Sequence, residues 1–411
     1  MPKNSVDIYI DNRLTATLVR DPNRSEYAFS YAKDAQDPVS LTMPVCDRTD
    51  VFMFLPPVLE TSLPEGELLE AIYRKMGKII KLSDDFDILK LVGCNMVGRL
   101  TVVPSGERPE DHDAFIGHDR LMSLLRAEDS RELLTQAMIE MAERTGISGV
   151  LPKTFGLSNP KTRMIIPAGN YIVKAESDEF PGICVVEHGC MTACRNAGLT
   201  VPDTILSDDG KTILVKRFDI REDGGKYGFE DFCSLGGFGR RYKYDKSYEF
   251  VSRIASLFAT SDNDRTQLFK TFAMMHFLQN GDAHLKNFGV LYSSEEDVRL
   301  SPTYDIVTTT SFIQNDLPAL TYQGMKKWLM TNEIIAFGIQ HCGLKKEEAG
   351  KLVDECLSGI EKTIPYIESL SVQYGHSSTL KSLETFRKAL SGQNIPPSIV
   401  AAKTKKKFSQ N

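Results

Sequence analysis

Residues 280–288 contain the strongest pattern of chemically active side chains in this sequence. They read NGDAHLKNF, follow the apolar run FKTFAMMHFLQ, and place Asp282 and Asn287 five positions apart in a short loop. Phosphoryl transfer needs an aspartate that orients the acceptor hydroxyl and takes its proton, and an asparagine a short loop away that holds Mg²⁺. Each residue alone could belong to an ordinary turn, but the order and spacing favour a catalytic loop. His284, inside the loop, is interpreted as structural rather than as a base.

A second acidic residue follows where this chemistry requires one. The segment SPTYDIV places Asp305 directly after an expected hairpin, VLYSSEEDVRL. A carboxylate at that point can bridge the β- and γ-phosphates of ATP through a metal ion. We therefore predict that Asp282 is the catalytic aspartate and that Asn287 and Asp305 hold magnesium.

A lysine on an expected strand could supply a cation for the phosphates. Lys174 lies in NYIVKAE beside apolar neighbours, where burying an ammonium group is costly unless an anion receives it. A nucleotide phosphate is the natural partner in this context, whereas a solvated strand lysine is the simpler alternative. Glu187, near the start of the next expected helix, could pair with Lys174 or could only complement the helix dipole.

A phosphate-covering loop is expected in SGVLPKTFG, which follows a helix and precedes two strands. Its candidate ATP contacts are Gly149, Val150 and Lys153. The segment lacks the G-x-G-x-x-G pattern, so the motif is weak on its own. Pro152 fixes φ and removes one backbone donor from this loop.

The connector between the two expected lobes is LVKRFD. Backbone groups of Lys216 and Phe218 could hydrogen-bond adenine there, and Asp219 could lie near the ribose. For Phe218, packing in the core is the alternative, and the two roles are compatible.

Hydrophobic periodicity and turn residues divide the chain into a β-rich N-terminal domain, a small β-rich lobe and a larger helical lobe. These cover residues 1–105, 106–218 and 219–411. The boundary near residue 105 lies in the acidic, Gly- and Pro-containing stretch PSGERPEDHDAF. A small β-rich lobe followed by a helical lobe is the layout of protein-kinase-like phosphotransferases, which hold ATP between the lobes. The predicted fold class is therefore α+β, with a bilobal kinase-like fold.

Strands are expected where apolar residues alternate, and helices where they recur every three to four residues. In the N-terminal domain we expect strands in VDIYIDN, LTATLVR and YAFSYA, a helix over 67–80, and two strands in LVGCNMVGRLTVVP. In the small lobe we expect helices over 118–128 and 130–144, strands in ISGVLPKTFG, RMIIPAG, NYIVKAE and TILVKRFDI, and a helix in GICVVEHGCMTACRNAGL. From about residue 228 we expect five helices and one β-rich interruption, NFGVLYSSEEDVRLSPTYDIV.

Composition narrows the classes of protein that fit. A chain of 411 residues exceeds what one hydrophobic core usually serves, which favours two or three domains. The formal net charge of -6 disfavours a surface that binds nucleic acid as a whole. The eight cysteines form no C-x-x-C pair, which indicates thiols in a reducing cytosol rather than a zinc site. With no signal-peptide pattern and no run of roughly 18 apolar residues, we expect a soluble, cytoplasmic protein that makes no membrane contact.

Taken together, the motifs resemble the HipA family of bacterial serine/threonine kinase toxins. The resemblance rests on SGVLPKT, NYIVKAE, EHGCMTACRNAGLTVPDT, LVKRFD, NGDAHLKNF and SPTYDIV. Residues 5–103 are similar in pattern to the β-rich domain that precedes the kinase in that family. The resemblance implies that Asp282 is catalytic, that Asn287 and Asp305 hold the metal ion, and that Lys174 binds phosphate.

The resemblance also implies regulation, a substrate class and partners. Ser148 matches the serine that the family autophosphorylates. A phosphate adds about −2 charges, which repel the ATP phosphates, expel the loop and silence the enzyme. Family members phosphorylate a serine on a translation protein, such as an aminoacyl-tRNA synthetase, and arrest growth, which links them to persistence. A small DNA-binding antitoxin neutralises them, and the pair represses its own operon, so DNA is contacted through the antitoxin.

Two other functions remain open at this point. The pattern G-D-x-H-x-x-N also resembles aminoglycoside-type phosphotransferases and lipid kinases, but the N-terminal β domain and the lack of an evident acidic substrate pocket argue against a small-molecule kinase. A non-catalytic kinase-fold corepressor would not need intact Asp282, Asn287 and Asp305. Mutation of Asp282 would separate them, because a corepressor keeps its repression and a toxin loses its toxicity.

Overall fold

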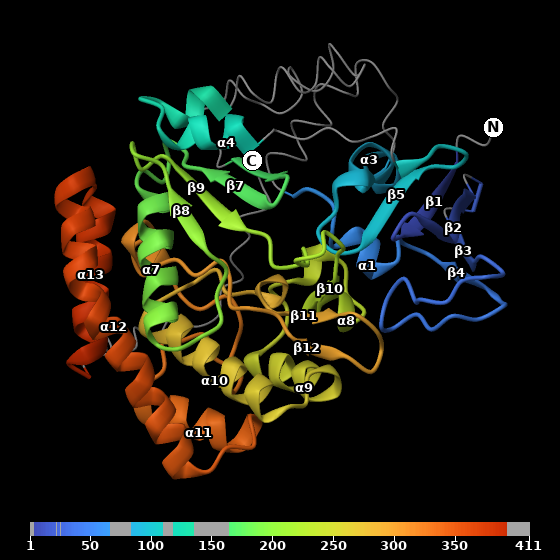
Figure 1. Ribbon diagram of the computed structural model, residues 1–411. Helices are drawn as coiled ribbons and strands as arrows, with labels where there is room; N and C mark the ends of the chain where they lie inside the picture. The colour runs from blue at the N-terminus through green and yellow to red at the C-terminus, as the bar shows by residue number, and fades with distance from the viewer. Residues whose placement is uncertain are drawn as a thin grey trace.

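The computed structural model shows a β-rich N-terminal unit beside a small lobe and a helical lobe (Figure 1). The structure describes residues 4–21, 23–24, 26–65, 84–109, 118–134 and 164–392. The helix predicted over 67–80, most of the helix predicted over 130–144 and the strand and phosphate loop predicted between 147 and 156 lie outside the described residues.

An antiparallel sheet with the order β4-β3-β2-β1-β5 forms the N-terminal unit. Its strands are β1 (Ser5–Ile10), β2 (Arg13–Asp21), β3 (Glu26–Tyr31), β4 (Thr49–Phe52) and β5 (Leu100–Pro104). The alternating residues Val6, Ile8 and Ile10 are buried, as expected for a strand with one face on a core. The three strands predicted in the first part of the chain are confirmed, and the short helix α1 (Pro57–Glu60) follows them.

The segment LVGCNMVGRLTVVP contains one strand, and the prediction of two strands is wrong. Its first residues end helix α3 (Asp85–Val92) and continue into a 3-10 turn, so only β5 is a strand. The Asp84 carboxylate caps α3 by accepting hydrogen bonds from the backbone N–H groups of Phe86 at 3.1 Å and Asp87 at 3.3 Å. The cap and most of α3 precede Leu91, where the segment begins, so the segment itself carries no signal for the start of the helix.

The small lobe is a four-stranded sheet with the order β6-β7-β9-β8, and helix α7 packs against it. Its elements are α4 (His118–Leu125), β6 (Met164–Ala168), β7 (Tyr171–Ala175), α7 (Ile183–Asn196), β8 (Thr204–Leu206) and β9 (Thr212–Lys216). These include the strands predicted around β6, β7 and β9 and the helix predicted at α7. The turn after α7 uses Gly198 at φ 78°, a left-handed conformation that favours glycine. Strand β8 was not predicted.

Helices dominate the large lobe, and all five that were predicted are present. They are α9 (Tyr248–Phe258), α10 (Asp262–Phe277), α11 (Thr331–His341), α12 (Lys346–Tyr374) and α13 (Ser377–Leu390), with the short α8 (Phe232–Leu235) before them. The predicted β-rich interruption supplies β11 (Gly289–Tyr292) and β12 (Val298–Leu300), and β10 (Gly228–Asp231) completes their sheet. Strand β10 was not predicted.

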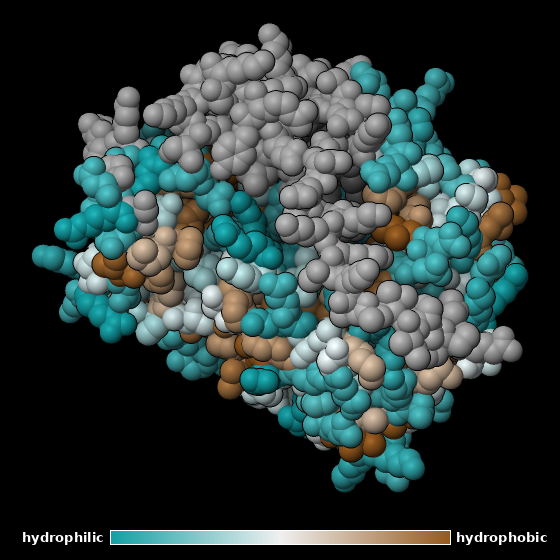
Figure 2. All heavy atoms as spheres, turned by 180° about the vertical axis from the view of Figure 1, so that it is seen from behind, coloured by the Kyte–Doolittle hydropathy of each residue, from teal (hydrophilic) through white to brown (hydrophobic). Residues whose placement is uncertain are grey.

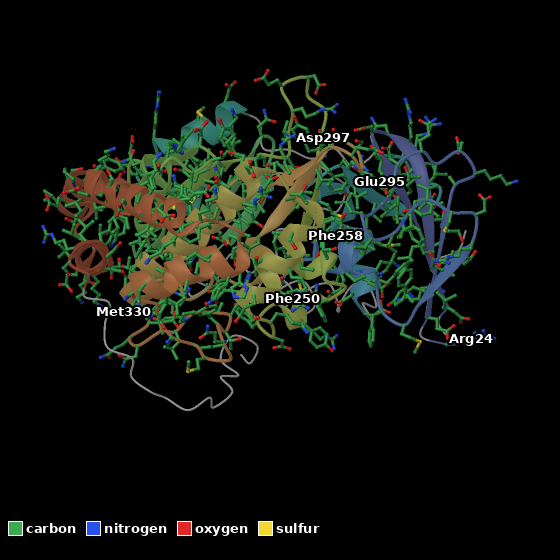
Figure 3. The ribbon with its side chains drawn as sticks, turned by 90° about the horizontal axis from the view of Figure 1, so that it is seen from below. Arg24, Phe250, Phe258, Glu295, Asp297 and Met330 are labelled. Atoms are coloured by element: carbon green, nitrogen blue, oxygen red, sulfur yellow. The ribbon has the colours of Figure 1, made fainter. Side chains whose placement is uncertain are left out.

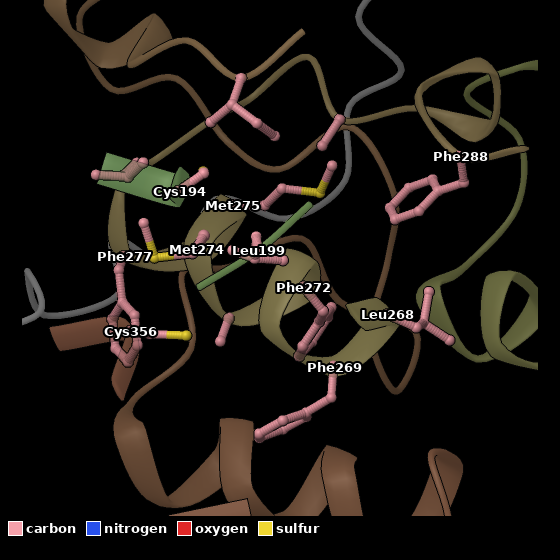
Figure 4. Packing of buried hydrophobic residues seen from close by; sticks show 14 of the residues in the cluster. Cys194, Leu199, Leu268, Phe269, Phe272, Met274, Met275, Phe277, Phe288 and Cys356 are labelled. Carbon is pink, nitrogen blue, oxygen red and sulfur yellow. The ribbon is translucent and has the colours of Figure 1, made fainter. Parts of the chain in front are cut away.

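Helix α10 lies at the centre of the large core. Figure 4 shows Phe269 and Phe272 pointing from α10 toward α11, and the Phe272 ring stacks on Phe337 with centroids 3.7 Å apart. Cys194 of α7 and Cys356 of α12 belong to the same buried cluster, so the core spans both lobes. This shared core holds the helix before the predicted catalytic loop in a fixed place between the lobes.

Helices α7 and α12 pack so closely that a glycine is required between them. A Cβ atom added at Gly359 of α12 would lie 2.5 Å from the Cα atom of Ala197. Such overpacking typically costs about 1–3 kcal/mol, so we expect Gly359→Ala to lower the free energy of unfolding by that amount, measured with urea. Gly350→Ala on the same helix is the control: a Cβ there meets nothing within 4 Å, so it should gain about 0.5–1 kcal/mol. Equal effects of the two changes would contradict this packing.

The N-terminal unit packs against the large lobe. Arg99 Nη1 donates to the backbone oxygen of Ser293 at 3.3 Å, in the turn between β11 and β12. Figure 3 labels Glu295 and Asp297 in this turn, on the side of the N-terminal unit. In β10 the buried Glu230 carboxylate accepts a hydrogen bond from Ser40 at 2.7 Å. The N-terminal unit and the large lobe therefore share buried polar contacts.

Among the coloured residues of the face that Figure 2 presents, polar side chains predominate and apolar side chains are interspersed between them. Among the described residues, no helix is both long enough and apolar enough to cross a membrane.

Candidate active site

Lys174, Glu187 and Asp305 meet although they lie on three separate segments of the chain. Lys174 on β7 donates from Nζ to Glu187 Oε1 on α7 at 2.6 Å and to Asp305 Oδ1 at 2.7 Å. The side chains of Lys174 and Glu187 are 8% and 1% exposed, and that of Asp305 is 32% exposed. A buried ammonium group requires such partners. The structure thus places the predicted phosphate-binding lysine between a buried carboxylate and one that reaches solvent.

The catalytic-loop asparagine joins the same cluster. Asn287 ends the 3-10 helix η4 (Leu285–Asn287), and its Nδ2 donates to Asp305 Oδ2 at 3.2 Å. Its Oδ1 accepts the backbone N–H of His284 at 2.9 Å, which closes the loop on itself. Asn280 Nδ2 donates to the backbone oxygen of Asp305 at 3.2 Å. The two segments that were predicted to bind metal are therefore tied directly to each other.

Two non-glycine residues at this site have left-handed backbone conformations. Gln279, before the loop, has φ 52°, and Asp305 has φ 58°. Such conformations cost of order 1–3 kcal/mol each and persist where the surroundings enforce them. Thr309 provides part of this support, because its Oγ1 accepts from Gly281 N at 2.7 Å and donates to Gln279 O at 3.2 Å. A side chain at Gly281 would collide with Thr309 and Asp316.

Asp282 is an exposed residue of the loop, and Tyr244 binds its carboxylate. The Tyr244 hydroxyl donates to Asp282 Oδ1 at 2.7 Å. Desolvation of the carboxyl group by the surrounding protein raises the pKa of Asp282 to about 6. The negative charges of Asp305 and Asp316 raise this pKa further, whereas the Tyr244 hydrogen bond and the Lys243 charge lower it. The group can therefore exchange a proton near neutral pH.

His284 has the surroundings of a structural residue. It is buried, and its ring packs edge-on against Tyr244 with centroids 5.0 Å apart. Burial, together with the neighbouring Lys243 and Lys286 charges, lowers the pKa of His284 to about 3. The imidazole is therefore neutral at physiological pH.

The connector between the lobes contains the three residues predicted to contact adenosine. Lys216 is exposed at the end of β9, and its backbone N–H donates to Asp203 O at 2.8 Å. Phe218 is half-buried, and its ring lies 5.3 Å from that of Tyr304 and 5.5 Å from that of Phe229.

The Asp219 carboxylate, which was predicted to lie near the ribose, is bound by groups of the protein. It binds Arg217 at 2.5 and 3.0 Å and accepts from the backbone N–H of Gly98 at 2.7 Å, and the residue is 1% exposed. Asp219 thus links the connector to the N-terminal unit. A ribose contact by this carboxylate would have to break a buried ion pair.

Sequence reasoning missed the residues that support the loop from other segments, namely Tyr244, Tyr304 and Thr309. Tyr304 directly precedes Asp305, and its hydroxyl donates to the backbone oxygen of Lys286 at 2.6 Å. Tyr244 is 38 positions from Asp282, and nothing in its segment YKYDK indicates that contact. Asn280 was part of the motif but had no role assigned. The predicted residues Ser148, Gly149, Val150 and Lys153 lie outside the described residues.

Asp305 and Asn287 offer a carboxylate and an amide to a metal ion. Mg²⁺ in phosphotransferases binds one or two carboxylates together with phosphate and water oxygens, rather than a cage of protein ligands. Within the described ranges, no group of three or more His, Cys, Asp or Glu residues could hold a metal ion. The oxygen donors at Asp305 and Asn287 fit Mg²⁺ that arrives with the phosphates of a nucleotide.

A β-rich lobe, a helical lobe, a buried Lys–Glu pair, a D-x-x-x-x-N loop and a later aspartate together define a kinase-like fold. Residues 145–364 match the HipA-like C-terminal domain, and residues 6–103 match the HipA N-terminal domain. The first of these matches spans more than half of the chain. The chain therefore belongs to the HipA family.

Individual relatives agree with this membership. A Sinorhizobium fredii protein named "Putative kinase Y4dM" is 29% identical over 386 residues, which are 86% of this chain and 88% of that protein. A second protein of the same organism, "Putative kinase Y4mE", is 22% identical over 75% of this chain and 78% of its own length. A chain in the solved complex of Shewanella oneidensis HipA, HipB and operator DNA superposes with a TM-score of 0.67 at 16% identity, over 94% of this chain and 96% of that one. The structural match extends over both the N-terminal unit and the kinase-like part.

Proposed function

We propose that this protein is an ATP- and Mg²⁺-dependent serine/threonine protein kinase that acts as a toxin. The convergence of Lys174, Glu187, Asn287 and Asp305 beside Asp282 carries the proposal. The buried Lys174–Glu187 pair contacts Asp305, the aspartate that follows the D-x-x-x-x-N loop. Phosphoryl transfer uses that same set of groups to position phosphates and an acceptor hydroxyl.

Asp282 acts as the base in this mechanism. The serine Oγ forms a bond to the γ-phosphorus while the bond from that phosphorus to the β,γ-bridging oxygen breaks, and the serine proton passes to Asp282. ADP leaves with the bridging oxygen. A pKa of about 6 keeps Asp282 largely ionised at neutral pH and still able to take a proton. Tyr244 fixes the carboxylate in orientation through its 2.7 Å hydrogen bond.

Lys174 and Asp305 handle the phosphates. The Lys174 ammonium is shared between Glu187 and Asp305. With ATP present, Lys174 would keep its bond to Glu187 and turn its remaining N–H groups to phosphate oxygens. Asp305 and Asn287 would be the residues that hold Mg²⁺. A bound Mg²⁺ would supply positive charge beside the β- and γ-phosphates at these two residues.

We also propose the regulation and the partners that the family resemblance implies. Autophosphorylation of Ser148 switches the enzyme off, a small HipB-like DNA-binding antitoxin neutralises it, and a translation protein is the phosphate acceptor. The solved relative that supports the antitoxin partner is described as a complex of HipA, HipB and operator DNA. The Ser148 site rests on its position in the segment SGVLPKT.

Mass-spectrometric mapping after incubation with Mg²⁺ and ATP tests the proposed function. We expect a phosphoserine at Ser148 in the wild-type chain, and no phosphate when Ser148→Ala is treated in the same way. Labelling of an added aminoglycoside or lipid without any phosphoserine would instead favour a small-molecule kinase. If the protein neither binds ATP nor transfers phosphate, the kinase proposal is wrong, and a binding role in repression remains.

A further inference from the structure

Acidic side chains of the N-terminal unit meet basic side chains of the large lobe along one seam. Glu60 at the end of α1 and Asp85 at the start of α3 both bind Arg240, with the Arg240 Nη2 atom 2.7 Å from Asp85 Oδ1 and the Nε atom 3.4 Å from Glu60 Oε1. Glu65 binds both Lys243 and Lys286. The side chains along this seam are 9% to 27% exposed, so solvent screens these pairs only in part.

Glu65 is the member of this seam that reaches the catalytic loop. One of its oxygens accepts from Lys243 Nζ at 2.5 Å, and the other accepts from Lys286 Nζ. Burial by itself would raise the pKa of Glu65, but the charges of Lys286 and Lys243 and their hydrogen bonds lower it to about 2. The carboxylate is therefore ionised at any physiological pH, and a single anion holds two cations together.

Each of the two lysines directly precedes, in the sequence, a residue of the proposed active site. Lys286 precedes Asn287, and its backbone oxygen accepts the hydroxyl of Tyr304 at 2.6 Å. Lys243 precedes Tyr244, whose hydroxyl binds Asp282. The Lys243 backbone oxygen also accepts the N–H of Leu285 at 3.1 Å, inside the loop. Moving either lysine therefore moves Tyr244 or the loop residues between Asp282 and Asn287.

We propose that Glu65 of the N-terminal unit is a positioning residue of the catalytic loop. By binding both Lys243 and Lys286, the Glu65 carboxylate fixes the position of Tyr244 relative to the catalytic loop. The N-terminal unit therefore contributes to the geometry of the active site. The effect on catalysis rests on the proposed kinase function, whereas the effect on the loop does not.

Glu65→Gln keeps the size of the side chain and removes the charge that both lysines require. We expect kcat for phosphate transfer to fall about 10- to 100-fold, because small displacements of catalytic groups have effects of that size. The KM for ATP should change less than kcat, since Lys174 and Glu187 lie outside this contact. Hydrogen exchange of the amides in residues 281–289 should become faster. Glu65→Asp, which keeps the charge, should recover part of the activity.

Asp85→Asn is the matched control, because it removes one carboxylate charge from the same seam. Its partner Arg240 retains Glu60 and also donates to the backbone oxygen of Pro64 at 3.2 Å, so Arg240 stays anchored to the N-terminal unit. We expect wild-type kcat and wild-type exchange of residues 281–289 for this variant. If Glu65→Gln does not fold, Lys243→Met serves instead, because it removes one of the two cations and leaves the other paired.

The outcomes separate this inference from the proposed function. If the wild type transfers phosphate and Glu65→Gln keeps its kcat, or if Asp85→Asn loses as much activity, the positioning role is wrong. If the wild type transfers no phosphate but Glu65→Gln alone speeds exchange in the loop, the kinase proposal fails and the positioning role stands. Unchanged exchange in Glu65→Gln overturns the positioning role whatever the activity.

Discussion

Asp282→Asn should reduce phosphate transfer by about 10²- to 10⁴-fold, the usual contribution of a positioned general base. An amide keeps the shape of the side chain and can still accept from Tyr244, but it cannot take the serine proton. ATP binding, measured by calorimetry, should be nearly unaffected, because the phosphate-binding cluster of Lys174, Asn287 and Asp305 is intact. The loss should therefore appear in kcat and in the yield of phosphoserine.

Asp354→Asn is the control for this change. Asp354 is exposed on α12, where the same carboxylate-to-amide substitution touches no site residue. The variant should match the wild type in rate and in unfolding. An Asp282→Asn protein that still phosphorylates at the wild-type rate would remove Asp282 from the mechanism. A variant that loses ATP binding as well would show that Asp282 supports the loop rather than the chemistry.

Local patterns predicted the parts of the site that lie within one short segment. Asp282 and Asn287 share a loop bounded by an apolar helix and a strand, and such a segment fixes the spacing of its own side chains. Lys174 and Glu187 are 13 positions apart on a strand and the following helix, which is close enough for a pairing to be considered. The same reasoning located all five large helices, because their apolar residues recur at the helical period.

Long-range contacts were beyond this reasoning. Glu65 and Lys286 are 221 positions apart, and no periodicity connects them. The connector LVKRFD predicts that Asp219 lies near the ribose, but the Asp219 carboxylate accepts a hydrogen bond from the distant Gly98 of the N-terminal unit. Strand β10 was not predicted because its sequence, GFED, contains a glycine and two acidic residues, which are rare in strands. Glu230 of this strand is buried with the help of a distant partner, Ser40.

The Lys174–Glu187 pair allows stability to be separated from catalysis. Lys174→Met removes the ammonium 2.6 Å from the buried Glu187 carboxylate. Breaking a buried pair on one side typically costs about 3–5 kcal/mol, and the exposure of Asp305 lets water replace part of what that residue loses. We therefore expect Lys174→Met to lower the free energy of unfolding by about 3 kcal/mol and to abolish measurable phosphate transfer.

The double variant Lys174→Met/Glu187→Met should regain most of the lost stability, because an apolar pair of similar volume often replaces a buried ion pair at little cost. It should regain no activity, since neither methionine can bind a phosphate. Urea unfolding and phosphate transfer, measured on the same preparations, make the comparison, with Lys362→Met on the exposed face of α12 as the control. Recovery of activity together with stability would mean that Lys174 has only a structural role, and the phosphates would then need another cation.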